Sequence, residues 1–253
     1  SVAQFERVNA DATRNVVQQA LAAGVRRFVH ISSNSAIGTN PGPEDVFRDE
    51  EPYNPYLGYG RSKMLGELAV TQVLSEAAIP GVILRPPWFY GRFQPDRQAR
   101  FLRTVRSGRF PLVGDGSNRR SMVDVDSLAQ AAALALRADT HGVRRYWIAD
   151  AHPYAMTDIL AAVQQGARLE GLPVRVGHLP LPAVAGTFAR RVKTAGVQAL
   201  QVLAAGEAHR AGSAGFHPGH HHIGMIVACD LAAEPGQGLT HGDHRVVRQR
   251  GRQ

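Results

Sequence analysis

The sequence predicts a doubly wound α/β fold, in which helices cover both faces of a parallel sheet. Two observations predict it: short runs of β-forming residues alternate with longer stretches of helical periodicity, and the runs end in polar or proline-rich loops. A 44% hydrophobic composition over 253 residues suffices to bury such a core. No apolar run approaches the roughly 20 residues that cross a bilayer, so we expect a soluble, cytoplasmic protein without a membrane partner.

The first half of the chain predicts two helices and two strands. Apolar residues recur every three or four positions over residues 4–23, which predicts an amphipathic helix that Gly24 ends. Residues 27–32 form a short β-rich run, the first expected strand. After a long polar loop, residues 56–77 predict a second helix. Residues 81–85 predict a second strand, which two consecutive prolines end.

The second half continues this alternation. A helix is expected over residues 96–107, and a Gly-Asp-Gly turn follows it. Asp124 or Asp126 can then cap a further helix, because a short carboxylate accepts hydrogen bonds from the first amides of a helix. Residues 145–149 are a third strand candidate, and Thr157 is a candidate N-cap for a helix that ends near residue 169.

The formal net charge of +8 is concentrated in one segment of the chain. Residues 85–120 hold nine arginines against two aspartates, a local excess of +7. Such a patch attracts polyanions, whether nucleic acid, a nucleotide diphosphate or an acidic lipid surface. The alternative is that the arginines between positions 97 and 106 only solvate one side of a surface helix.

The end of the chain has a different character. From residue 209 onward it shows no helical or strand period, and we expect an irregular tail. Four histidines there could collect a metal: His217, His220, His221 and His222. No carboxylate or thiolate stands at a suitable spacing, so we predict no metal site. Cys229 is the single cysteine and is interpreted as an ordinary small apolar residue.

Tyr59 and Lys63 form the pattern that carries chemistry. They stand at positions i and i+4 of a predicted helix, so both project from one face about one turn apart. A nearby cation favours the phenolate and lowers the pKa of a tyrosine, which is otherwise too high for a base near neutrality. Ser33 ends the first predicted strand, where its hydroxyl can bind a substrate oxygen while Tyr59 moves the proton.

These features resemble the extended short-chain dehydrogenase/reductase superfamily, specifically its NAD-dependent epimerase/dehydratase family. The similarity runs in order from about Asn9 to Leu128. It includes the helix and strand before Ser33, the segment Leu-Arg-Pro-Pro-Trp-Phe-Tyr-Gly at residues 84–91, and the segment from Gly-Asp-Gly onward at residues 114–126. The resemblance implies a Rossmann-like sheet, NAD or NADP as cofactor, and a small-molecule substrate.

The resemblance also implies a role for each matching residue. Tyr59 is the implied general acid/base, Lys63 lowers its pKa and holds the nicotinamide ribose, and Ser33 binds the reacting oxygen. The implied cofactor-binding residues are Asn9, Ser33, Tyr59, Lys63, Pro86 and Pro87. The implied substrate-binding residues are Asn34, Ser35, Trp88 and Arg120. Arg120 would meet a diphosphate if the substrate is a nucleotide sugar. No nucleic acid is expected as a partner, and a homodimer is expected by analogy.

The sequence also departs from the family pattern. The glycine-rich turn that holds the dinucleotide phosphates is absent, so we expect a sheet incomplete at the N-terminus, an open sheet edge and poor dinucleotide binding by this chain. Asn34 and Ser35 replace the acidic pair of the family's sugar dehydratases, which argues against dehydration. Trp88 stands where sugar-nucleotide epimerases often carry asparagine.

Together, these observations predict three regions and one leading function. The regions are a partial Rossmann-like NAD(P)-binding domain at 1–150 with an excursion into the substrate lobe at 87–123, a small C-terminal substrate lobe at 151–208, and an irregular tail at 209–253. The leading function is an oxidoreductase or epimerase acting on a nucleotide sugar or a related alcohol or ketone. The alternatives are a hydroxysteroid- or flavonoid-type ketone reductase, a non-catalytic basic binding module, and an inactive fragment.

Overall fold

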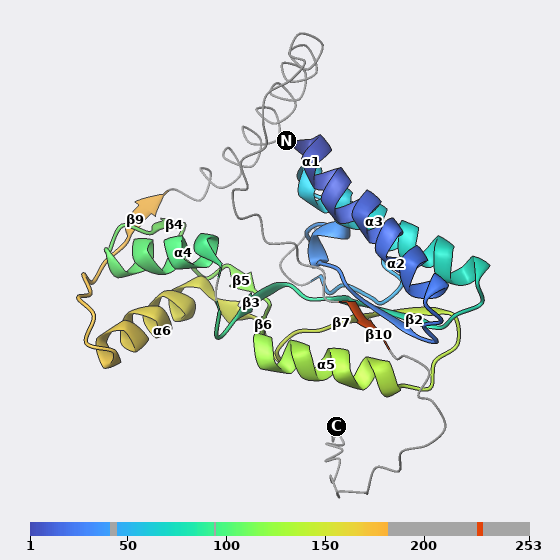
Figure 1. Ribbon diagram of the computed structural model, residues 1–253. Helices are drawn as coiled ribbons and strands as arrows, with labels where there is room; N and C mark the ends of the chain where they lie inside the picture. The colour runs from blue at the N-terminus through green and yellow to red at the C-terminus, as the bar shows by residue number, and fades with distance from the viewer. Residues whose placement is uncertain (41–44, 94, 182–226, 230–253) are drawn as a thin grey trace, which may run out of the picture.

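A mainly parallel sheet forms the centre of the molecule (Figure 1). The computed structural model describes residues 1–40, 45–93, 95–181 and 227–229. The sheet order is β10-β1-β2-β7. Strands β1 (Phe28–Ile31), β2 (Gly81–Arg85) and β7 (Val143–Trp147) run parallel, and β10 (Val227–Cys229) pairs antiparallel with β1. The expected parallel sheet is therefore confirmed.

Helices cover both faces of this sheet. Helices α2 (Ala12–Ala22) and α3 (Leu57–Glu76) pack on one face, and α5 (Val125–Arg137) packs on the other (Figure 1). Successive strand residues point to opposite faces, so Phe28 and Ile83 meet the first pair of helices while their neighbours in the strands meet α5. Both β1 and β2 are buried along their whole length, as strands covered on both faces should be. The doubly wound fold class is confirmed.

The N-terminal helix is continuous but contains one wider turn. Helix α1 (Val2–Glu6) leads into a π-helical turn, η1 (Arg7–Asp11), and then into α2. Gly24 ends the run as predicted, with a φ of +78°, and its N–H donates to the Leu21 carbonyl. The periodicity of the sequence predicted the helix but not the π-helical turn.

A second group of elements lies beside the sheet (Figure 1). Its strands pair in twos: β3 (Trp88–Tyr90) with β6 (Met122–Asp124), β4 (Pro111–Val113) with β9 (Leu179–Leu181), and β5 (Arg119–Arg120) with β8 (Tyr154–Ala155). Helices α4 (Asp96–Arg106) and α6 (Met156–Leu169) pack around a separate buried cluster that includes Val105, Leu112, Met122 and Ile159. This group contains most of the predicted excursion and the first part of the predicted lobe. Residues 182–208 of that lobe lie outside the described residues.

The two capping predictions had different outcomes. Asp124 is the N-cap of α5, and its Oδ2 accepts hydrogen bonds from the next amides along the helix. Thr157 is not the N-cap of α6, because the helix begins at Met156 after Ala155. The amide of Met156 donates to the Asn118 carbonyl, and that of Thr157 to the Gly116 carbonyl. A neighbouring loop thus satisfies amides that would otherwise need a side-chain cap.

Two strands of the sheet differ from the prediction. The third strand, β7, lies two residues earlier than the predicted range 145–149. Strand β10 lies within the predicted irregular tail, where no strand was expected, and pairs with β1 so that Cys229 lies opposite Phe28. The remainder of the predicted irregular tail, including the histidine run, lies outside the described residues. The described helices include none long and apolar enough to cross a membrane.

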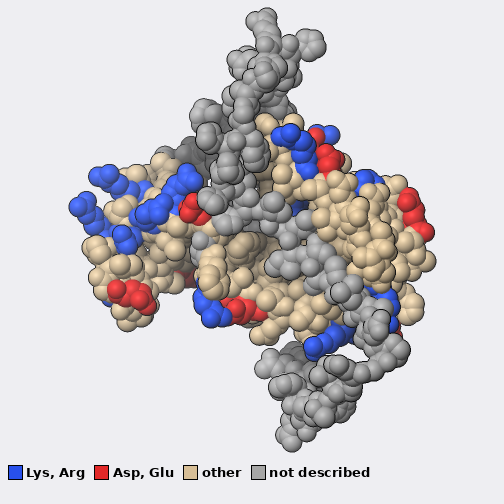
Figure 2. Space-filling model, viewed as in Figure 1, with Lys and Arg blue, Asp and Glu red and all other residues tan. Residues whose placement is uncertain are grey.

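The arginine-rich segment does not form a single surface. Arg85 is only 1% exposed, so its place in the predicted surface patch was wrong. Arg92 pairs with Asp126 at 3.1 Å. The exposed members of the segment include Arg100, Arg103, Arg109, Arg119 and Arg120. In the view of Figure 2, several basic side chains gather over the α4 side of the molecule.

Candidate active site

Tyr59 and Lys63 lie one turn apart in the first half of α3. The Tyr59 ring is 39% exposed and contacts Phe5 edge-on, with 5.7 Å between ring centroids. Lys63 is 3% exposed, and its Nζ donates a hydrogen bond to the Ile31 carbonyl at 3.0 Å. Helix α3 therefore anchors the ammonium at the end of β1, and it leaves the phenol accessible to a small molecule.

The charge of Lys63 is balanced between burial and a carboxylate. Burial lowers the pKa of Lys63 to about 8, and Glu67, one turn further along α3, opposes that shift. A pKa of about 8 leaves the ammonium mostly charged at pH 7.

The loop after β1 lies against the first turn of α3. The Ser35 carbonyl accepts a hydrogen bond from the Tyr56 amide at 3.3 Å. A Cβ at Gly60 would overlap the same carbonyl oxygen, so glycine permits this close approach. Ser33 is 9% exposed, and its Oγ donates to Asn34 Oδ1 and accepts from the Ser35 amide. The structure thus brings the polar loop to the helix that carries Tyr59.

Asn9 supports the same turn of α3 from the opposite side. Its Nδ2 donates to Ser62 Oγ at 3.0 Å, and Ser62 Oγ donates to the Tyr59 carbonyl at 2.7 Å. A Cβ at Gly66 would overlap the Asn9 carbonyl oxygen, so the η1 turn and α3 approach each other closely there. Such π-helical turns occur frequently at functional sites. Asn9 therefore lies beside the helical turn that carries Tyr59.

The proline pair completes this group of predicted residues. The Asn34 amide donates to the Pro86 carbonyl at 3.1 Å, which joins the loop after β1 to the end of β2. Pro86 is buried and Pro87 is half-buried. The residues expected to bind the cofactor thus surround the carboxyl ends of β1 and β2. Open α/β sheets place their ligands outside these strand ends.

Two of the predicted substrate-binding residues form a separate pair in the second group of elements. The Arg120 guanidinium lies over the Trp88 ring, 4.6 Å from its centroid. Phe101 contacts the same ring edge-on at 4.7 Å between centroids. Trp88 follows Pro87 directly, so the chain itself connects this pair to the strand ends. Asn34 and Ser35, the other two, stay with the loop after β1.

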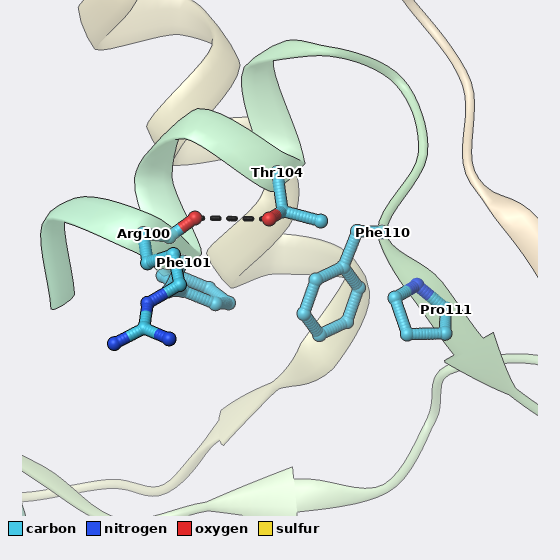
Figure 3. Close-up of a pocket in the computed structure, with 5 residues that line it drawn as sticks. All are labelled: Arg100, Phe101, Thr104, Phe110 and Pro111. Atoms are coloured by element: carbon cyan, nitrogen blue, oxygen red, sulfur yellow. Dashed lines mark hydrogen bonds between the residues drawn. The ribbon is translucent and has the colours of Figure 1, made fainter. Parts of the chain in front are cut away.

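Sequence reasoning missed a surface hollow beside this pair. Figure 3 shows the aromatic rings of Phe101 and Phe110 at this hollow, with Pro111 beside them and Arg100 on α4. The two phenylalanine rings are 5.3 Å apart and edge-on, and the hollow has a volume of about 450 Å³. The signal in the sequence was one phenylalanine within the arginine-rich helix, Phe101, and another shortly after it, Phe110.

Sequence reasoning also missed a buried ion pair next to Lys63. Arg85 Nη2 lies 2.8 Å from Glu67 Oε2, and both side chains are at most 1% exposed. The same carboxylate accepts a hydrogen bond from the Tyr53 hydroxyl at 2.9 Å, and burial is the largest cause that raises the pKa of Tyr53. Arg85 Nη1 also donates to the Asp49 carbonyl at 3.2 Å. The pair therefore ties the loop before α3 to the end of β2.

His30 is a second buried polar group near Lys63. It is 1% exposed, and neither ring nitrogen has a hydrogen-bond partner within the described part of the chain. Burial, and secondarily the charge of Lys63, lower the pKa of His30 to about 3. His30 is therefore neutral in the folded protein at any pH well above 3.

Acid should destabilise the fold through His30. Between pH 6.5 and 3 the unfolded chain binds a proton at this histidine and the folded chain does not, so stability falls as the pH falls through that window. From pH 7 to pH 5 we expect a loss of about 2 kcal/mol from this group. Urea unfolding at both pH values measures it. His30→Leu should remove this part of the loss, whereas the exposed control His152→Gln should not. Equal pH dependence in all three proteins would contradict the assignment.

The sheet order, the layers and the polar residues at the strand ends define the class first: this is a Rossmann-like α/β protein. Residues 1–149 match the family model described as the NAD dependent epimerase/dehydratase family. The chain belongs to that family, which confirms the resemblance seen in the sequence. The family is NAD-dependent, which agrees with the predicted class of cofactor.

Curated relatives are similar over most of this chain and about half of their own length. An uncharacterized protein, y4nL, from Sinorhizobium fredii is 44% identical over 188 residues, covering 74% of this chain and 53% of the relative. The N-acetyl-alpha-D-glucosaminyl-diphospho-ditrans,octacis-undecaprenol 4-epimerase of Escherichia coli O157:H7 is 27% identical over 177 residues, covering 69% and 52%. The chain thus spans about half the length of these relatives.

Solved structures share the fold. DesIV, a dTDP-glucose 4,6-dehydratase from Streptomyces venezuelae solved with NAD and TYD bound, has a TM-score of 0.58 and 24% sequence identity. The alignment covers 71% of this chain and 56% of that one. At this level of identity the likeness shows the Rossmann-like architecture.

The predicted cofactor-binding residues lie together near the ends of β1 and β2. Tyr59, Lys63, Asn9 and Pro86 gather at the strand ends, where the nicotinamide ribose is expected. The sequence contains no Gly-x-x-Gly-x-x-Gly turn for the pyrophosphate. Weak dinucleotide binding by this chain stays a prediction. Within the described residues, no group of three or more His, Cys, Asp or Glu side chains could hold a metal.

Proposed function

We propose that the chain carries the acid–base half of an NAD(P)-dependent oxidoreductase or epimerase that acts on a nucleotide sugar. One observation carries the proposal: the ammonium of Lys63 is anchored to the end of β1, one turn from the accessible phenol of Tyr59. Ser33 follows the same strand end and lies in the loop that contacts α3. The homodimer, the cytoplasmic location and the division at residues 150 and 208 stay predictions.

The chemistry follows from the three side chains. Ser33 would donate a hydrogen bond to the oxygen of a substrate alcohol, and Tyr59, as the phenolate, would accept the hydroxyl proton. Lys63 would favour that phenolate by its charge. The bound nicotinamide would supply the hydride acceptor for the carbon that loses its hydrogen. In an epimerase, Tyr59 would return the proton when the ketone is reduced from its other face.

The surface hollow supports a nucleotide as part of the substrate. Phe101, Phe110 and Pro111 offer flat apolar surfaces of the kind on which a base packs. Arg100 and Arg120 supply guanidinium groups, which suit a diphosphate because their planar donors match phosphate oxygens. The name of the Escherichia coli relative also describes a diphosphate-linked sugar.

Turnover of UDP- and dTDP-sugars, compared with hydrophobic ketones, tests the proposal. Because weak dinucleotide binding is predicted for this chain, NAD(P) is supplied in large excess, and under these conditions we expect conversion of at least one nucleotide sugar. Arg120→Gln should raise its KM about 10- to 100-fold through loss of a charged hydrogen bond. The matched control Arg109→Gln, also exposed, should leave KM within about twofold. Conversion of ketones alone would favour the ketone reductase, and salt-dependent binding of duplex DNA without turnover would favour the basic binding module.

A further inference from the structure

A second pocket lies between β3, α4 and α6, and Phe101 lines both this pocket and the hollow in Figure 3. It has a volume of about 230 Å³. Most of its lining is apolar and includes Trp88, Phe89, Leu102, Met122, Ile159 and Val163. Tyr90 and Leu102, which also line it, are 39% and 40% exposed, so the pocket is open to solvent at one end.

Gln98 places one polar group in this apolar lining. The side chain is 4% exposed, and its Nε2 donates to the Phe89 carbonyl at 3.4 Å. A carbonyl cannot donate a hydrogen bond, so this contact fixes which end of the amide is the acceptor. Within the described residues, Gln98 Oε1 has no hydrogen-bond partner. A buried acceptor without a donor is unfavourable and calls for a partner that supplies one.

We propose that this pocket binds a small, neutral, apolar molecule whose single hydroxyl or N–H donates to Gln98 Oε1. An engineered cavity of about 150 Å³ binds benzene, so a pocket of about 230 Å³ can hold one substituted ring. Among the described residues, the lining includes no Lys, Arg, Asp or Glu side chain, so a charged ligand would meet no described charge to compensate its desolvation. The inference does not depend on the acid–base role of Tyr59.

An ordered water is a poorer occupant than such a ligand. A buried water needs two to four polar partners. The described side chains in the lining that carry polar atoms are Gln98, Tyr90 and Trp88; the Tyr90 hydroxyl already donates to Asp150 Oδ2 at 2.9 Å, and the Trp88 indole can only donate. An apolar ligand with one hydrogen-bond donor can bond to Gln98 Oε1 and also fill the space between α4 and α6.

Phenol and toluene, which have similar size but differ in one hydroxyl, test the proposal. Each is titrated into the protein while methyl NMR signals of Leu102, Ile159 and Val163 are followed. We expect phenol to bind about 10-fold more tightly than toluene. Gln98→Leu should weaken phenol about 10-fold and strengthen toluene. The control Gln165→Leu, on the exposed side of α6, should change neither affinity.

Several outcomes would overturn the inference. These are equal affinity for the two probes, an unchanged phenol affinity in Gln98→Leu, or no saturable shift at the three methyl groups with either probe. Gln98→Met, which keeps the length and flexibility of the side chain, serves as the second variant if Gln98→Leu does not fold. It should lose the preference for phenol in the same way.

Discussion

Tyr59→Phe should lower turnover of the nucleotide sugar by about 10²- to 10⁴-fold, the usual contribution of general acid–base catalysis. The substitution removes only the hydroxyl, and the half-exposed ring keeps its edge contact with Phe5. KM should change little, because the lost group acts on the proton in transit and not on the remote parts of the substrate. Steady-state kinetics with a nucleotide sugar that the protein converts measure both parameters.

Tyr56→Phe is the matched control for this experiment. Tyr56 is the N-cap residue of α3 and lies three residues before Tyr59 in the chain. Its substitution also removes one phenolic hydroxyl, at a residue next to the same helical turn. Turnover should stay within about twofold of that of the unaltered protein. Equal losses in the two variants, or an unaltered rate in Tyr59→Phe, would refute the catalytic assignment.

Glu67→Ala should destabilise the protein by about 3–5 kcal/mol, since it leaves Arg85 charged and buried without its ion-pair partner. Three hydrogen bonds from Arg85 to this carboxylate and one from Tyr53 would be lost together. Urea unfolding followed by circular dichroism gives the change in free energy of unfolding. Glu76→Ala, at the exposed end of the same helix, should change it by at most about 0.5 kcal/mol.

Removal of both charges distinguishes the ion pair from simple packing. Glu67→Leu combined with Arg85→Leu should be more stable than either single variant, because neither member of the pair is then left charged and buried without the other. Additive losses in the double variant would show that the two side chains do not interact. A loss below about 1 kcal/mol in Glu67→Ala would contradict the burial of the pair.

The elements of the fold could be predicted because their signals are local. Helical periodicity, the stop at Gly24 and the Asp124 cap depend on residues within one or two turns of each other. The start of α6 could not be predicted in this way, because its first amides donate to carbonyls about 40 residues earlier in the chain. The pairing of β10 with β1 joins residues about 200 positions apart, and no local pattern encodes such a contact.

In the candidate site too, features with a local sequence pattern were predicted, and features that depend on distant contacts were missed. The spacing of Tyr59 and Lys63 placed both on one helical face, and the strand before Ser33 placed the loop at the edge of the sheet. Arg85 was misjudged because a charged residue in an arginine-rich segment reads as exposed, whereas its partner Glu67 lies on another element. The aromatic hollow was missed because Phe101 and Phe110 meet only once α4 has turned back on β4.

The glycines of α3 have a consequence for how the site responds to ligands. At Gly60 and Gly66 the helix backbone is touched by carbonyl oxygens from two other segments, with no side chain between them. Side-chain rotamer changes therefore cannot shift the helix at these two points, and the first of them lies next to Tyr59 in the chain. Preorganisation of this kind lowers the reorganisation needed when a substrate arrives, so a ligand should find the phenol already in position.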